Sequence, residues 1–150
     1  MKSKVLEVPH IHPRVAGYLS SSNWCFEHHY RTGGETLDFV AIHRDRMDVA
    51  MIECKRFIES LDSVIMQIRH NHRALGIPHA IKVLFVLDKP TKRHLYILGR
   101  ENILVQGVDL IHPCAPYPDS LLEFQHLLTR LRFADLFGQS KDYTYVDDED

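Results

Sequence analysis

Residues Leu37 to Arg56 read LDFVAIHRDRMDVAMIECKR, and this stretch decides how the chain folds. Two apolar runs of strand length, 37–42 and 48–55, flank a short charged link. The link is so short that the two strands must pair as an antiparallel hairpin. Because apolar residues occupy both faces of both strands, we expect the hairpin to lie in the centre of its sheet.

Three charged side chains interrupt this hairpin, namely Asp38 in the first run and Glu53 and Lys55 in the second. An unpaired charge in a core strand is costly or changes its pKa. Side chains alternate between the faces of a strand, so Glu53 and Lys55 point the same way. Asp38 falls opposite or diagonal to Glu53 across the hairpin. Two carboxylates and an ammonium group therefore converge at the open end of the hairpin.

A divalent metal ion explains this convergence. Two neighbouring carboxylates should not both ionise without a cation, and hard ions such as Mg²⁺ or Mn²⁺ take oxygen ligands of this kind. The sequence therefore predicts a metal site held by Asp38 and Glu53. Such a metal lowers the pKa of bound water and clamps a phosphate oxygen, while Lys55 orients the water or offsets charge on the phosphorane. This chemistry hydrolyses phosphodiesters.

The segments around the hairpin predict alternating helices and strands. A short helix should start at Pro13, a strand should follow over 24–30, and a longer helix is capped by Ser60 or Asp62 and stopped by Gly76. A strand at 80–87 completes a strand-helix-strand unit, which implies parallel pairing. Further along the chain, 91–106 fits either a helix or two short strands, 108–111 indicates a strand, and 121–137 indicates a closing amphipathic helix.

This order of elements and charges resembles the PD-(D/E)xK nuclease superfamily, which includes restriction endonucleases, Holliday-junction resolvases and many repair nucleases. The resemblance is carried by Asp38 on one strand and by Glu53-Cys54-Lys55 on the next, with a helix a few residues later, and it covers about residues 13–87. Leu37 replaces the proline of the named motif, which many members lack. The resemblance implies a restriction endonuclease-like three-layer α/β sandwich, with a mixed central sheet flanked by helices.

The same resemblance implies roles for individual residues. Asp38 and Glu53 would be metal ligands and Lys55 the catalytic lysine, with Glu27 as an accessory acid and Gln67 as a helix residue near the site. Two alternatives stay open at this point. Glu7 is the other candidate for the accessory acid, although Pro9 and Pro13 make a helix through it awkward. Gln67 also fits the polar flank of an ordinary amphipathic helix.

Basic residues outside the motif are candidate phosphate contacts, since Lys and Arg supply the sequence-independent part of DNA affinity. We favour Arg56, which follows the motif directly, and expect ordinary solvated loop residues at Arg44, Arg46, Lys89, Lys92 and Arg93. No recognition-helix signature is present, so we expect DNA structure or a partner to set specificity. Duplex or branched DNA is the expected partner, and a homodimer would give so small a protein more duplex coverage.

The composition predicts a single globular domain. The chain has 150 residues, 45% of them apolar and 25% charged, and domains most often contain about 100 to 150 residues. Five acids and one base occupy the tail, 141–150, and the remaining 1–140 carry 17 Lys and Arg against 15 Asp and Glu. We expect a faintly basic folded body and a disordered acidic tail. The sequence shows no membrane span or secretory signal, so a cytoplasmic protein is expected.

Cysteine and histidine give weaker signals. Three widely spaced cysteines, Cys25, Cys54 and Cys114, are typical of reduced, buried thiols. Eleven histidines suggest zinc, and Cys25-x-x-His28-His29 is the nearest approach to a ligand cluster. Alternation along the strand, however, places Phe26, His28 and Tyr30 on one face and Cys25 on the other. No second ligand pair has finger-like spacing, so the sequence does not favour zinc.

The function predicted from these observations is a Mg²⁺-dependent DNA endonuclease similar to a resolvase or repair nuclease. The alternative is a non-catalytic module that binds nucleic acid or protein on the same fold. A third reading is a structural domain in which Asp38, Glu53 and Lys55 form only a buried ion-pair network.

Overall fold

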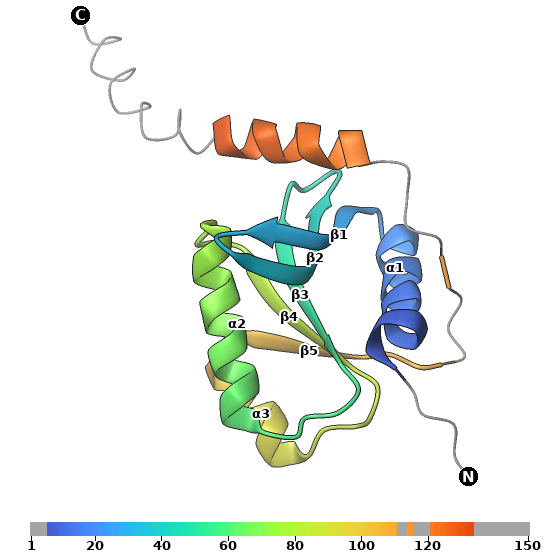
Figure 1. Ribbon diagram of the computed structural model, residues 1–150, viewed down its shortest axis with the longest axis vertical. Coiled ribbons are helices and arrows are strands. Elements are labelled where there is room, and N and C mark those ends of the chain that lie inside the picture. Colours follow the sequence, from blue (N-terminus) through green and yellow to red (C-terminus); the bar gives the residue numbers. More distant parts are fainter. Residues whose placement is uncertain (1–5, 111–113, 116–120, 134–150) are drawn as a thin grey trace, which may run out of the picture.

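A mixed sheet of five strands, in the order β1-β2-β3-β4-β5, runs through the molecule (Figure 1). The computed structural model describes residues 6–110, 114–115 and 121–133. The strands are β1 (Trp24–Thr32), β2 (Glu35–His43), β3 (Val49–Lys55), β4 (Ile81–Val86) and β5 (Ile103–Gly107). The first three pair antiparallel, and β4 and β5 continue the sheet in parallel with β3. The predicted hairpin, its central position and the parallel crossover to β4 are confirmed.

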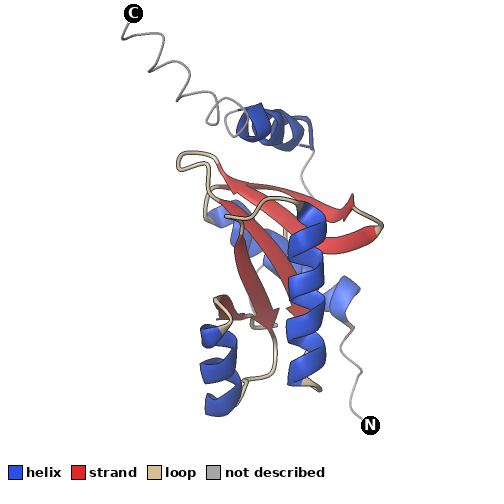
Figure 2. Cartoon of the chain, turned by 90° about the vertical axis from the view of Figure 1, so that its left-hand side faces the viewer, coloured by secondary structure: helices blue, strands red, loops and turns tan. Residues whose placement is uncertain are grey.

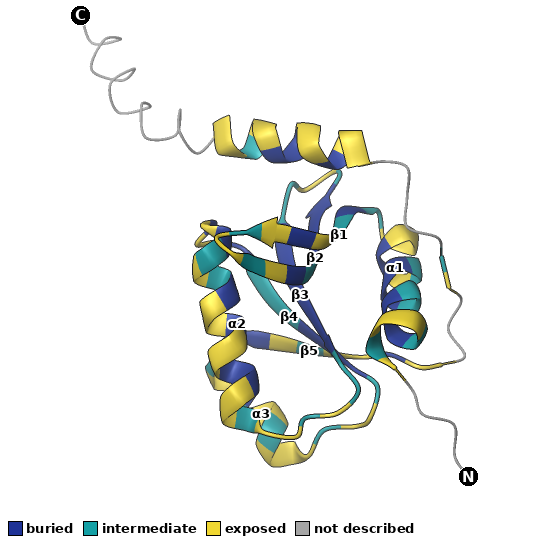
Figure 3. Ribbon diagram, in the orientation of Figure 1, coloured by how far each residue is buried: buried dark blue, intermediate teal, exposed yellow. Residues whose placement is uncertain are grey.

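Helices cover both faces of this sheet (Figure 2). A short π-helical turn, η1 (Glu7–Ile11), leads into α1 (His12–Ser21) on one face, and α2 (Leu61–Leu75) covers the other. The remaining helices are α3 (Lys92–Arg100), between β4 and β5, and a helix over 121–133. Buried side chains form one core on each side of the sheet, so the helices carry their exposed faces outward (Figure 3).

Local sequence signals fix the ends of the helices. Ser60 caps α2, because its hydroxyl oxygen accepts a hydrogen bond of 3.4 Å from the Ser63 amide. Gly76 ends the helix in the left-handed region at φ 72°, which favours glycine. Thr91 caps α3 in the same way through the His94 amide at 3.1 Å. The bounds and caps predicted for α2 are confirmed. The short helix α1 is also present, but it begins at His12 and continues from η1, so its predicted start at Pro13 is wrong.

The predicted alternation along β1 is wrong beyond His28. Phe26 lies in the core under α1, as expected, but Tyr30 lies with Cys25 in the core under α2. The cause is His29, whose φ of 53° reverses the order in which side chains point to the two faces.

The C-terminal part of the sheet also differs from the prediction. Residues 91–106 were expected to form either one helix or two strands. They contain one helix, α3, and most of the edge strand β5. The strand predicted at 108–111 is wrong over 108–110, since β5 already occupies the edge and ends at Gly107. Position 111, the end of the helix predicted over 121–137 and the acidic tail lie outside the described residues.

The three thiols form no disulfide among the described residues. Cys25 and Cys54 are buried as predicted, but Cys114 is exposed because it lies in the connection outside both cores. Within the described part of the chain, no helix combines the length and the hydropathy needed to cross a membrane.

Candidate active site

The predicted carboxylate pair lies where the β2–β3 hairpin opens. Phe39 pairs with Ile52 in the last matched position of the ladder, and Asp38 and Glu53 are the next residues along the two strands. Asp38 is held there by the backbone of β3, because its Oδ2 accepts a hydrogen bond of 2.7 Å from the Cys54 amide. The structure therefore brings the two carboxylates together and fixes one of them to the opposite strand.

Glu53 is the more deeply buried of the two, with 3% of its surface exposed. Its Oε1 accepts a hydrogen bond of 2.9 Å from Nδ2 of Asn71 on α2. Burial, followed by the negative charge of Asp38, raises the pKa of Glu53 to about 8. Glu53 is thus protonated at neutral pH when no cation is present.

Asp38 responds to the same environment in a different way. Burial raises the pKa of Asp38, while the Cys54 amide and a hydrogen bond with Glu53 oppose the rise. The interaction between the two carboxyl groups lowers the pKa of Asp38 and raises that of Glu53, so Glu53 is the group that keeps its proton to higher pH. A divalent cation bound by both carboxylates can replace the proton that Glu53 holds.

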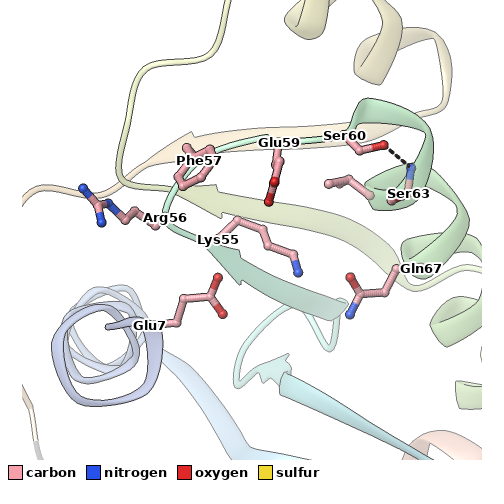
Figure 4. A pocket seen from close by; sticks show the side chains of 9 residues that line it. Glu7, Lys55, Arg56, Phe57, Glu59, Ser60, Ser63 and Gln67 are labelled. Atoms are coloured by element: carbon pink, nitrogen blue, oxygen red, sulfur yellow. Dashed lines mark hydrogen bonds between the residues drawn. The ribbon is translucent and has the colours of Figure 1, made fainter. Parts of the chain in front are cut away.

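Lys55, at the end of β3, lies beside the pair. Its positive charge lowers the pKa of both carboxyl groups, yet it forms no ion pair with either one in the described part of the structure. The ammonium group extends into a pocket of about 410 Å³ (Figure 4). This arrangement differs from a closed ion-pair network, because the lysine remains directed at a space that a ligand can enter.

Gln67 and Glu7 line the same pocket as Lys55. The Gln67 amide on α2 and the Lys55 ammonium point toward one another across it, and the Glu7 carboxylate enters from the side of η1 (Figure 4). Pro9 and Pro13 were expected to make a helix through Glu7 awkward, yet η1 begins at Glu7. Pro9 lies in the first turn of η1, where a backbone N–H has no acceptor within the helix, so its missing donor costs nothing.

Glu27, the other candidate accessory acid, lies on β1 opposite Val40. Val40 is two residues from Asp38 on β2, so Glu27 occupies a diagonal position relative to Asp38. Burial raises the pKa of Glu27. Its role as an accessory acid stays a prediction.

Arg56 lies at the edge of the pocket, but its guanidinium group is directed away from Lys55 (Figure 4). Its Nε is 3.9 Å from Oδ2 of Asp88 and is buried without a hydrogen-bond partner among the described residues. The predicted contact between Arg56 and nucleic acid also stays a prediction.

Sequence reasoning missed two residues that contact the carboxylates. Asn71 was detectable, because it follows Gln67 by four residues and therefore lies on the same helix face. His12 was not detectable, since its approach to within 3.8 Å of Asp38 depends on how α1 packs on the sheet. Burial, with a smaller contribution from the charge of His29, lowers the pKa of His12 to about 4, so its ring is neutral.

Comparisons with known proteins place this geometry in a wider context. No known protein family matches the chain by its sequence profile, and no curated protein matches it either. Solved structures do resemble it. The repair endonuclease from Pyrococcus abyssi aligns with a TM-score of 0.51 at 10% identity, over 75% of this chain and 50% of that one. EndoMS in complex with double-stranded DNA aligns with a TM-score of 0.53 at 12% identity, over 77% and 50%.

The fold is nuclease-like. The predicted endonuclease-type α/β sandwich with a mixed central sheet is therefore confirmed. AF1548, a protein of unknown function, aligns as well, with a TM-score of 0.51 at 19% identity, over 73% of this chain and 59% of its own. The chain spans between 50% and 59% of the length of these structures.

Proposed function

We propose that this chain is a metal-dependent nuclease of the PD-(D/E)xK type that hydrolyses phosphodiester bonds in DNA. One observation carries the proposal. The register of the β2–β3 hairpin places Asp38 and Glu53 side by side, burial raises the pKa of both carboxyl groups, and the neighbouring Lys55 ammonium group extends into a pocket. The nuclease-like fold and the resemblance of Asp38 and Glu53-x-Lys55 to the nuclease motif support it.

The donor set fits Mg²⁺ or Mn²⁺, because both ions prefer carboxylate oxygens. Asp38 and Glu53 would hold the ion, which when bound polarises a phosphate oxygen and lowers the pKa of bound water. The Cys54 amide and the Asn71 side chain keep the two carboxyl groups in place through hydrogen bonds of 2.7 and 2.9 Å. Loss of the proton from Glu53 would accompany binding.

Lys55 and Gln67 would act on the phosphate from the pocket. The Lys55 ammonium would offset the negative charge that develops on the phosphoryl oxygens, an electrostatic effect that grows where water is excluded. The Gln67 amide, across the pocket, can both donate and accept hydrogen bonds and would orient the attacking water. Glu7 shares this pocket and is the better placed accessory acid, whereas Glu27 lies diagonal to Asp38 on β1.

DNA is the proposed substrate. One of the structurally similar proteins, EndoMS, has a structure in complex with double-stranded DNA. Arg56 would contact a phosphate beside the pocket after releasing its distant pairing with Asp88. Cutting both strands of a duplex calls for two sites, so we expect a homodimer on duplex or branched DNA. Sedimentation of the protein with and without a short duplex measures this assembly.

The experiment that tests the proposal is a cleavage assay on duplex, single-stranded and branched DNA, with Mg²⁺ or Mn²⁺ against EDTA. We expect metal-dependent cleavage by the native chain and a loss of at least about a hundredfold in Lys55→Ala. Arg73→Ala is a matched control, because Arg73 is an exposed cation on α2 that does not line the pocket.

Two results would count against this proposal. DNA binding without cleavage by the native protein identifies a binding module, and the enzyme proposal then fails. Cleavage that persists in EDTA, or that Lys55→Ala leaves unchanged, separates the activity from this site.

A further inference from the structure

Three histidines, His12, His28 and His29, face one another beside the carboxylate pair. One ring nitrogen of each lies within 4.8 Å of a ring nitrogen of the other two. The three come from two elements, His12 from the start of α1 and the other two from β1. This cluster is not part of the pocket that holds Lys55.

The backbone of β1 departs from regular geometry to form this cluster. Consecutive residues of a strand normally point to opposite faces of the sheet. His29 adopts a φ of 53°, however, and its ring stacks on that of His28 with centroids 3.8 Å apart and planes 26° from parallel. A non-glycine residue with positive φ is uncommon in a strand, and such outliers concentrate at functional sites.

His12 adds a buried donor atom that lacks a partner. Only 1% of the His12 surface is exposed, and its Nδ1 lies 2.8 Å from Nε2 of His28. The other ring nitrogen, Nε2, is buried, makes no hydrogen bond within the described residues, and lies 3.8 Å from Oδ2 of Asp38. Buried polar atoms are nearly always paired, so an orphaned one calls for an explanation.

We propose that His12, His28 and His29 bind a divalent transition-metal ion of the zinc class, with His12 coordinating through Nδ1. A metal on Nδ1 fixes the proton of the His12 ring on Nε2. That N–H then points to the Asp38 carboxylate, which is the carboxylate-histidine-metal arrangement common in protein zinc sites. The proposal thus accounts for the orphaned Nε2 with a small closure of the 3.8 Å distance.

The chemistry of the three rings suits this class of ion. Neutral imidazole nitrogens bind Zn²⁺ at about 2.0–2.1 Å, so the ligand nitrogens of a tetrahedral site lie about 3.4 Å apart. This separation falls between the 2.8 Å of the His12–His28 contact, which would open slightly, and the 4.8 Å limit of the cluster. His29 is exposed and can move by a rotamer change to close the gap. Its exposure also leaves a further coordination position open to solvent. Mg²⁺ prefers oxygen ligands, so the histidine site and the carboxylate site select different metals.

The spacing rules applied to the sequence could not find this site. They look for ligand pairs in one segment, whereas His12 and His28 are 16 residues apart and meet only through tertiary packing. The inference does not depend on the proposed nuclease activity, because it concerns metal binding at nitrogen ligands alone.

Zinc binding by the full chain, without a polyhistidine tag, tests this inference. Competition against a chromogenic chelator gives the Zn²⁺ affinity, and the visible spectrum of the Co²⁺ form reports the coordination geometry. We expect one equivalent of Zn²⁺ at the cluster and a loss of at least tenfold in affinity for His28→Gln and for His29→Gln. His79→Gln is the matched control, because His79 is an exposed histidine in the loop before β4, and it should bind as the native chain does.

Two further variants keep the result unambiguous. His12→Gln changes a buried residue and can unfold the chain, but His29→Gln alters an exposed side chain, so we expect it to keep the circular dichroism spectrum of the native chain. Glu53→Gln removes the carboxylate site and should keep the zinc equivalent. The inference is overturned if His28→Gln and His29→Gln bind Zn²⁺ as tightly as the native chain, or if Glu53→Gln abolishes binding.

Discussion

The buried carboxyl group of Glu53 makes the stability of the metal-free protein depend on pH in an unusual direction. The pKa of Glu53 rises from 4.5 to about 8 on folding, so the folded state keeps a proton that the unfolded state releases. The stability from this group is therefore fully present below pH 4.5 and is lost as the pH rises through 8. The difference corresponds to about 5 kcal/mol across this range as an upper bound.

Glu53→Gln isolates the effect. Glutamine has nearly the same shape, can accept the hydrogen bond from Asn71 and cannot ionise. In EDTA we expect the variant to be more stable than the native chain at pH 8 by several kcal/mol, and the two to converge near pH 5. This pH dependence of stability is opposite to that of a salt-bridged carboxylate, whose contribution to stability is lost as the pH falls.

Urea unfolding at pH 5, 6, 7 and 8 measures this difference as a change in midpoint. Glu59→Gln serves as the control, because Glu59 is an exposed carboxylate that lines the same pocket as Lys55. Its stability should follow the native profile. Parallel pH profiles for the native chain and Glu53→Gln would refute the raised pKa that burial and the Asp38 charge give to Glu53.

Three further outcomes follow from the same geometry. Mg²⁺ at about a hundred times its dissociation constant should stabilise the native chain by about 2.7 kcal/mol at pH 8, and an equal gain in Glu53→Gln would contradict binding at the pair. Asn71→Ala should lose about 1–3 kcal/mol in urea unfolding with its hydrogen bond to Glu53, and an unchanged midpoint would argue against that bond. Gly33→Ala and Gly34→Ala should each lower the free energy of unfolding by about 1 kcal/mol, because both glycines have positive φ. Gly33→Ala should lose more, since its Cβ would lie 3.2 Å from Ala74, and equal losses would contradict this packing.

The hairpin and its charges could be predicted because the information is local. The apolar runs and the short link fix the register of β2 against β3, which places Asp38 and Glu53 side by side. The same is true of α2, whose ends are marked by Ser60 and Gly76. These elements can be predicted without knowing the rest of the fold.

The histidine cluster and the pocket wall could not be predicted, because they depend on distant contacts and on an unmarked backbone change. A positive φ in histidine leaves no trace in the sequence, so the reversal at His29 moved Tyr30 to the unexpected face. Glu7 and His12 reach the site only because η1 and α1 pack across the sheet near β3. Helix periodicity could have placed Asn71 on the same face of α2 as Gln67, but nothing in the sequence indicates that its amide is buried.

Anomalous diffraction from a crystal of the full chain containing Mn²⁺ tests the central claim most directly. The account predicts a cation peak coordinated by both carboxylates, Asp38 and Glu53, with the Lys55 ammonium nearby. It also predicts that the peak disappears in Glu53→Gln. A structure in which the pair binds no cation at millimolar Mn²⁺, or in which the ion is held elsewhere and by neither carboxylate, would contradict the account.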